Sequence, residues 1–247
     1  MYQDILTIAV VTVFAFFAIY WMWFQGEVDG SRLIAKNSMK QQKFNIILVL
    51  VAAFIVKAIL AVKNEGYSVD ITCFRSWSET VFTGGLSHFY EGDVTDYPPG
   101  YMLVLWLVAA IRHLFNIDNY STTGLFMIKL FPMLFDLAAA YLIYVMAKKR
   151  FSEGMSLMLS TLYALNPAVV IDSSVWGQVD GVLCCMVLLT CYLFMEEKRI
   201  LAYFAFCAGV LLKPQMVMFA PIIIYSIIEQ VFLHDFNTKK MLRDLIG

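Results

Sequence analysis

Acidic and aromatic side chains gather between residues 66 and 100 of a chain that is otherwise mostly apolar. This stretch, GYSVDITCFRSWSETVFTGGLSHFYEGDVTDYPPG, contains the carboxylates of Asp70, Glu79, Glu91, Asp93 and Asp96. A carboxylate that aromatic rings partly shield from water can act as a general base and take a proton from a hydroxyl group. The alternative is a solvated loop between two helices, but long segments between apolar runs often carry function. We therefore treat it as a candidate site.

Asp70 is the strongest candidate for the base. It follows an apolar run by about eight residues, so it is expected near the membrane surface with its backbone held by a helix end. The acids at Asp93 and Asp96 come from a looser part of the stretch. The alternative is that Asp70 is the N-cap of a short amphipathic segment, residues 71–82, because Asp is favoured at that position. Both roles can hold at once.

Two later polar groups interrupt apolar sequence. The first, SSVWGQVD, offers an aromatic ring at Trp176, an amide at Gln178 and a carboxylate at Asp180. Trp176 alone could be an interface anchor, which is the usual place of Trp in membrane proteins. The second group is Lys213-Pro214-Gln215, where Lys213 can either extend to the membrane surface or hold a lipid phosphate by its charge. The sequence leaves both alternatives open.

Asp136 lies inside an apolar run of residues 124–147. Placing a carboxylate in the bilayer costs free energy, so such a residue usually indicates a function or a polar partner. Lys57 and Lys129 lie nearer the outer ends of their runs and are expected to extend toward the interface. A structural ion pair of Asp136 with one of these lysines ranks above a catalytic role.

The composition is that of an integral membrane protein. Of 247 residues, 61% are hydrophobic and 15% are charged, with a net charge of −1. No basic patch suggests nucleic-acid binding. Four of the five cysteines lie in apolar runs and no C-x-x-C pattern occurs, so neither a disulfide framework nor a cysteine metal site is expected. The first apolar run lacks the basic start and cleavage site of a signal peptide.

The apolar runs predict an all-α polytopic membrane fold. They cover residues 5–24, 44–62, 98–115, 124–147, 155–171, 181–195, 200–212 and 215–233. Basic residues between 25 and 43, 148 and 150, 198 and 199, and 239 and 243 fall on one side only if run 98–115 does not cross. We therefore predict seven crossing helices, an outer N-terminus and one re-entrant or outer-leaflet helix. Residues 1–43 would form a first helix with a cytoplasmic loop, and 44–247 a membrane module with an outer-face loop, 63–123.

The order of these motifs resembles a known family. Asp70 is followed by Arg75 and Trp77, by a GG-x-x-x-x-Y pattern ending at Tyr90, and by Asp96-Tyr97-Pro98-Pro99-Gly100; Asn166-Pro167, the Trp176 segment and Lys213-Pro214-Gln215 come later. This order is similar to that of the GT-C polytopic glycosyltransferases, which use polyprenyl- or dolichyl-phosphate sugars. Within them it resembles most the bacterial relatives of the second GPI mannosyltransferase. The resemblance covers about residues 44–233.

The resemblance implies an inverting transfer of mannose or glucose from a polyprenyl-phosphate donor to a glycan or lipid-linked acceptor. The enzyme would lie in a bacterial plasma membrane with its active site facing outward, and Asp70 would be the base. No cofactor is implied, and the metal requirement stays open. The substrate-binding residues would be Arg75, Trp77, His88, Tyr90, Asp96, Tyr97, Trp176, Gln178, Asp180, Lys213 and Gln215. Among them, Lys213 and Arg75 would contact the lipid phosphate.

The chain ends at Gly247, soon after the last apolar run, whereas such enzymes are usually longer. A shortened homologue, a truncated product and a module that needs a partner all fit this length. The rival function is a transporter, a flippase-like protein or a subunit of a glycan-assembly complex, in which Asp136 and the Lys213 break would line a path through the bilayer. No internal inverted repeat supports that rival.

Overall fold

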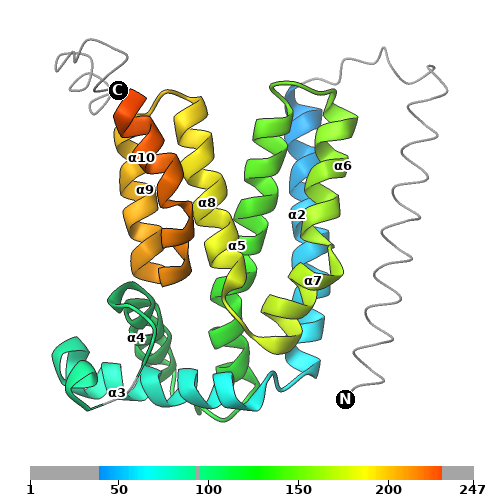
Figure 1. Cartoon of the computed structure of the whole chain (residues 1–247). Helices are drawn as coiled ribbons and strands as arrows, with labels where there is room; N and C mark the ends of the chain where they lie inside the picture. Colours follow the sequence, from blue (N-terminus) through cyan, green and yellow to red (C-terminus); the bar gives the residue numbers. More distant parts are fainter. Residues whose placement is uncertain (1–38, 93–94, 230–247) are drawn as a thin grey trace. The chain divides into compact units, whose positions relative to one another are not determined.

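The computed structural model describes residues 39–92 and 95–229, and every regular element in these ranges is helical (Figure 1). The all-α prediction is thus confirmed for the described part of the chain. The predicted first run, 5–24, the end of the last run and the basic tail lie outside the described residues. The elements are α2 (Met39–Lys63), α3 (Ser68–Gly92), α4 (Pro99–Leu114), α5 (Thr122–Ala147), α6 (Glu153–Ala164), α7 (Pro167–Val170), the π-helix η1 (Ile171–Trp176), α8 (Asp180–Met195), α9 (Arg199–Leu212), the 3₁₀ helix η2 (Pro214–Phe219) and α10 (Ala220–Ile228).

The chain divides into two compact units. Of the described residues, unit 1 comprises 39–73 and 117–181, and unit 2 comprises 74–92, 95–116 and 182–229. The helix α3 begins in unit 1 and continues in unit 2. Each unit is described below by itself.

Unit 1 is built on α2, α5 and α6, which lie side by side in Figure 1. One alanine of each helix, Ala53, Ala140 and Ala164, is fully buried, and the three pack together. Small residues let helix backbones come close, which is how apolar helices gain packing energy in a membrane. The Ser160 hydroxyl adds a 2.8 Å hydrogen bond to the Ala140 carbonyl. The three helices therefore form a tight frame.

The chain bends after α6. Leu165 ends that helix, and the Asn166 side chain accepts a hydrogen bond from the Ala168 N–H (2.9 Å) as the N-cap of α7. Pro167 at the first helical position fits such a start. The two apolar helical stretches on either side make an angle of 48°. The second stretch ends in the π-helix η1, whose last residue is Trp176.

Unit 2 contains α4, α8, α9 and α10. Gly100 at the start of α4 lies directly against the Leu211 backbone of α9, and Tyr203 of α9 shares a 3.1 Å hydrogen bond with Ser226 of α10. As the sequence predicted, Lys213-Pro214 interrupts the long apolar run. Pro214 begins the 3₁₀ turn η2, because proline cannot continue the α-helical hydrogen bonds of α9.

In the described residues two helical stretches, Gln42–Lys63 and Thr122–Ala147, are long and apolar enough to cross a membrane. A third is added if the bent pair Glu153–Ala164 and Pro167–Trp176 is one span. The helix from the predicted non-crossing run, Pro99–Leu114, is among the shorter apolar helices. The chain therefore has a membrane-type helical framework, and the count of seven crossings stays a prediction.

The loop expected between the apolar runs 44–62 and 98–115 was wrong in its backbone, because α3 occupies most of it. This helix includes the predicted amphipathic segment 71–82 and extends beyond it at both ends. Ile71, Phe74, Ser78 and Val81 are buried on one face of this helix. Their spacing is the three-to-four-residue repeat of an amphipathic helix. The helix is kinked at Gly85, where φ is 75°. The polar composition and the Gly-Gly pair concealed the full length of this helix, which the spacing of its buried residues indicates.

Candidate functional site

The predicted base meets two predicted binding residues in unit 1. The Asp70 Oδ2 accepts hydrogen bonds from the indole Nε1–H of Trp176 (2.9 Å) and from the side-chain amide of Gln178 (2.8 Å). These partners lie more than one hundred residues further along the chain, and the fold brings them to the start of α3. Both donors are neutral, so they orient the carboxylate without forming an ion pair with it.

Asp70 is not the N-cap of this helix, contrary to the alternative considered above. The helix starts at Ser68, and the Ile71 N–H donates to the Tyr67 carbonyl (3.0 Å). Asp70 therefore lies within the first turn, where the positive end of the helix dipole favours a negative charge. Its side chain is half-buried and turned to Trp176 and Gln178 instead of the helix end.

The amide of Gln178 is oriented by the backbone of the next residue. Its Oε1 accepts a hydrogen bond from the Val179 N–H (3.2 Å), which leaves the NH₂ group to face Asp70. Both donors bind Oδ2, and among the described residues no hydrogen bond reaches Oδ1 of Asp70. One oxygen of the carboxylate is thus held in place while the other can accept a proton.

The turn that carries Trp176 is fixed against the segment that leads into α3. The Tyr67 N–H donates to the Trp176 carbonyl (2.9 Å), and the two rings contact each other at a centroid distance of 5.1 Å. Gly177 has φ of 91°, a left-handed conformation that favours glycine. A Cβ at Gly177 would lie 2.7 Å from Cδ1 of Ile71, so the turn needs glycine for space as well.

Trp176 is 45% exposed while its N–H binds Asp70, so part of its side chain is accessible to a ligand or to lipid. Asp180 is exposed at the first position of α8. The structure therefore joins Trp176 and Gln178 to Asp70 by hydrogen bonds and places Asp180 shortly beyond them in the chain.

The mid-membrane acid forms an ion pair. Lys57 Nζ donates to Asp136 Oδ2 at 2.7 Å, and also to the Val169 carbonyl and the Ser173 hydroxyl, both at 3.1 Å. Lys57 is 0% exposed and Asp136 1%. This confirms the predicted structural pairing of Asp136. The expected extension of Lys57 to the interface was wrong, because its ammonium has polar partners inside the protein.

Lys129 is likewise buried rather than extended to the interface. Its Nζ donates to the main-chain carbonyls of Asn64 (2.7 Å), Ser174 (3.0 Å) and Val175 (3.3 Å). A buried ammonium needs such acceptors to replace its hydration. Lys129 and Asp136 are seven residues apart on α5 and therefore share one helix face. This seven-residue spacing could have predicted that Lys129 and Asp136 both point into the protein, toward polar partners.

The remaining predicted binding residues belong to unit 2. Trp77 and Tyr97 pack with buried Phe74, with ring centroids 5.8 Å from the Phe74 ring in each case. The Tyr90 hydroxyl donates to the Tyr97 carbonyl (3.0 Å). This aromatic group stabilises the junction between α3 and α4.

The polar candidates of unit 2 differ in exposure. Lys213 is 5% exposed and lies at the C-cap of α9. Arg75 is half-buried on α3. Three other predicted binding residues are exposed: His88, Asp96 and Gln215. Their roles in substrate binding stay predictions.

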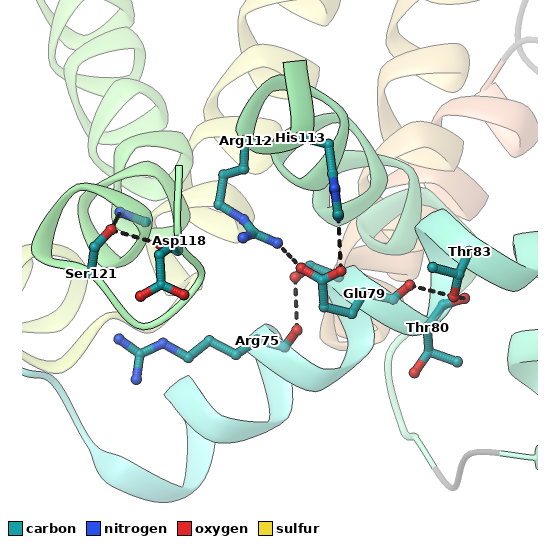
Figure 2. A network of polar contacts seen from close by, with 10 residues as sticks. Arg75, Glu79, Thr80, Thr83, Arg112, His113, Asp118 and Ser121 are labelled. Carbon is teal, nitrogen blue, oxygen red and sulfur yellow. Dashed lines mark hydrogen bonds and ion pairs between the residues drawn. The ribbon is translucent and has the colours of Figure 1, made fainter. Parts of the chain in front are cut away.

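The structure shows a polar cluster in unit 2 that the sequence did not indicate (Figure 2). Glu79 of α3 accepts from Arg112 and is 3.0 Å from His113 Nε2, both on α4. Arg112 is buried, and the His113 ring stacks on Phe82 at 4.5 Å. Burial alone would raise the pKa of Glu79, but the hydrogen bonds and charges of His113 and Arg112 outweigh it and lower that pKa below its ordinary value. The pattern that could have predicted this cluster is the Arg112-His113 pair at the end of an apolar run.

In the described part of the chain, no three His, Cys, Asp or Glu side chains lie together as metal ligands would. The candidate site of unit 1 thus consists of one carboxylate, an indole and an amide.

Comparison with known proteins relates the chain to mannosyltransferases. Residues 96–242 match the family of dolichyl-phosphate-mannose-protein mannosyltransferases. GPI mannosyltransferase 1 of Saccharomyces cerevisiae is 27% identical over 128 residues, which cover 49% of this chain and 29% of the yeast protein. The chain thus matches less than one third of the yeast protein's length. No solved structure matches significantly.

These matches confirm the resemblance to GT-C glycosyltransferases related to the GPI mannosyltransferases. The family match begins at residue 96, so it includes Trp176, Gln178 and Lys213 but not Asp70. The case for Asp70 is therefore carried by its two hydrogen bonds. Because the match covers more than half of this chain, the chain belongs to the family of dolichyl-phosphate-mannose-protein mannosyltransferases.

Proposed function

We propose that this chain is a membrane mannosyltransferase. It transfers a mannosyl group from a polyprenyl- or dolichyl-phosphate donor to an acceptor hydroxyl, with inversion at the anomeric carbon and with Asp70 as general base. Membership of the family of dolichyl-phosphate-mannose-protein mannosyltransferases supports the reaction type and favours mannose over glucose.

The observation that carries the proposal is the hydrogen bonding of Asp70. Its carboxylate is held by Trp176 and Gln178, which lie within the part of the chain that matches the family. A carboxylate in an ion pair would give up that pairing on taking a proton. Asp70 has neutral donors on one oxygen, so it can accept a proton while its position is kept.

The reaction needs a base and not an acid. The phosphate leaves as a stable anion when the bond from the anomeric carbon to the phosphate oxygen breaks. The acceptor hydroxyl is barely ionised at neutral pH, so its proton must pass to a base while its oxygen bonds to the anomeric carbon. A positioned base contributes about 10²–10⁴-fold. This corresponds to roughly 3–5 kcal/mol of the barrier.

The lipid phosphate is proposed to bind Lys213. A buried lysine at a helix break offers a fixed positive charge in a setting with little competing water. Lys213→Met should raise the donor concentration that half-saturates the enzyme, whereas the exposed Lys198→Met serves as the control. An unchanged donor requirement in an active Lys213→Met enzyme would remove this role.

The site is proposed to face the outer side of a bacterial plasma membrane, in a protein of seven crossing helices. The basis is the distribution of basic residues, which places α4 as a helix that does not cross. Cysteine substitutions in residues 116–123 test this arrangement. Labelling by an impermeant reagent from the outer side is expected, and labelling only from the cytoplasmic side would contradict it.

The activity itself is tested by reconstituting the purified chain in liposomes with radiolabelled polyprenyl-phosphate mannose. Transfer to a mannoside or glycolipid acceptor is expected from this donor, and none from a nucleotide-linked mannose. Transfer from the nucleotide sugar, or none from either donor at any acceptor supplied, would overturn the proposal.

A further inference from the structure

The buried ammonium of Lys129 lies directly behind the candidate site of unit 1. Its three close acceptors belong to two segments: Asn64 follows α2, and Ser174 and Val175 belong to η1. The first segment leads through Tyr67 to Asp70, and the second leads to Trp176. One cation thus bridges the two chain segments that meet at the base.

Contacts on both sides of Lys129 extend this bridge to the site. The Tyr67 N–H donates to the Trp176 carbonyl, one residue beyond Val175. The Lys129 stem lies under the left-handed turn, since a Cβ at Gly177 would be 3.3 Å from its Cε. The Lys129 side chain therefore supports the turn between Trp176 and Gln178, the two donors to Asp70.

The second buried lysine supports the other end of η1. Lys57 binds the Val169 carbonyl and the Ser173 hydroxyl, and its charge is matched by Asp136. Both lysines thus act on the same short helix from the α2 and α5 side. Lys129 differs in that its ammonium donates to several main-chain carbonyls, whose positions define the path of the two segments.

We infer that Lys129 is a positioning residue for the proposed transfer: it holds Trp176 and Gln178 in hydrogen-bonding position on Asp70. This inference rests on the proposed function of Asp70. Lys129 contacts neither substrate nor reacting atoms, and it acts through the backbone of residues 64–67 and 174–178. Without its ammonium, the three carbonyls lose their common donor and the turn is free to move relative to Asp70.

A measurement that does not depend on activity tests the positioning. The chain has five tryptophans, so protein labelled with 5-fluorotryptophan gives a resolvable ¹⁹F spectrum in which Trp176→Phe identifies the Trp176 signal. Lys129→Met is expected to broaden this signal or to shift it in the same direction as Asp70→Asn does. Lys63→Met, the same change at the exposed lysine that ends α2, should leave it in place. A wild-type Trp176 signal in folded Lys129→Met would overturn the inference.

Kinetics then separate this inference from the function on which it rests. Lys129→Met should lower kcat by about ten- to a hundredfold, because misplacing a reacting group by ~1 Å can cost about 10². The KM for the lipid donor should stay near wild type. In an Asp70→Asn background the same change should have no further effect on kcat. An equal further loss in that background would overturn the inference, whereas full turnover of Asp70→Asn would overturn the proposed function and leave the ¹⁹F test standing.

If Lys129→Met does not fold, hydrogen exchange in the unaltered protein decides the question. The hydrogen-bonded amides of Tyr67, Gly177 and Gln178 should open together, because Lys129 and the Tyr67–Trp176 bond join the two segments. Rates that differ more than about tenfold between the two segments would contradict the bridge.

Discussion

Two carboxylates on α3, Asp70 and Glu79, are held in opposite ways. Asp70 accepts from an indole and an amide, which are neutral. Glu79 accepts from Arg112, which is a permanent cation, and also faces His113 (Figure 2). Each carboxylate joins α3 to residues far away in the sequence. Only the nature of the donors differs.

The difference separates a group that can react from one that stabilises. An ion-paired carboxylate is a poor base, because taking a proton removes the charge that its partner requires. A carboxylate that neutral donors orient keeps its place when it is protonated. The comparison supports the proposed role of Asp70 in chemistry and a role of Glu79 in the stability of unit 2, although both lie on the same helix.

The largest expected effect is on turnover. Asp70→Asn should lower kcat by about 10²–10⁴-fold, since the amide cannot take the proton. Its thermal midpoint should change little, because Asn can still accept a hydrogen bond from Trp176 or Gln178. Steady-state kinetics and thermal unfolding of one preparation measure both quantities. A variant that loses its fold instead would make Asp70 a structural residue like Glu79.

The next effect concerns the other carboxylate. Arg112→Met should lower the free energy of unfolding by about 1.5–3 kcal/mol, the usual worth of a hydrogen bond to a charged group. Turnover per folded molecule should stay within about twofold of wild type, as the cluster is assigned no role in chemistry. Denaturant titration measures the free energy of unfolding, and Arg150→Met, a change at an exposed arginine, is the control. A large fall in kcat at unchanged stability would break the comparison.

A smaller loss is expected when Asp70 keeps one of its two donors. Gln178→Leu should lower kcat roughly tenfold, which corresponds to ~1.4 kcal/mol and to one hydrogen bond. Trp176 continues to hold the carboxylate, so the fold should persist. Turnover equal to wild type would show that the amide does not orient the base.

The smallest effect is a pH dependence of stability that originates from Glu79. Its pKa is lowered from 4.5, so it contributes stability above about pH 4.5 and loses this contribution as the pH falls through the lower folded value. Glu79→Gln should flatten this part of the curve of thermal midpoint against pH. An unchanged acid limb in Glu79→Gln would mean that other carboxylates account for it.

The sequence predicted the helical framework because long apolar runs have few alternatives. The limits of α5, α8 and α9 and the break at Lys213-Pro214 follow from capping residues, charges and proline. The helix α3 was predicted only in part, as the amphipathic segment 71–82, because its buried residues are mixed with polar and glycine residues. Its buried face depends on packing partners from other parts of the chain.

The candidate site was predictable in its residue types but not in its pairing. Trp176, Gln178 and Asp70 were each selected as polar or aromatic residues at helix ends. Their mutual hydrogen bonds depend on the π-helix and on the φ of 91° at Gly177, which no local pattern specifies. The role of Lys129 was missed because a lysine near a helix end usually extends to the membrane surface.

Chemical rescue tests the role of Asp70 most directly. Asp70→Ala removes the carboxylate, and added formate can take its place as a proton acceptor if the missing group is a base. Transfer by Asp70→Ala is predicted to fall about 10²–10⁴-fold and to rise in proportion to formate concentration, while Glu79→Ala and the unaltered protein show no such rise. Wild-type transfer by Asp70→Ala in the absence of formate would contradict the assignment.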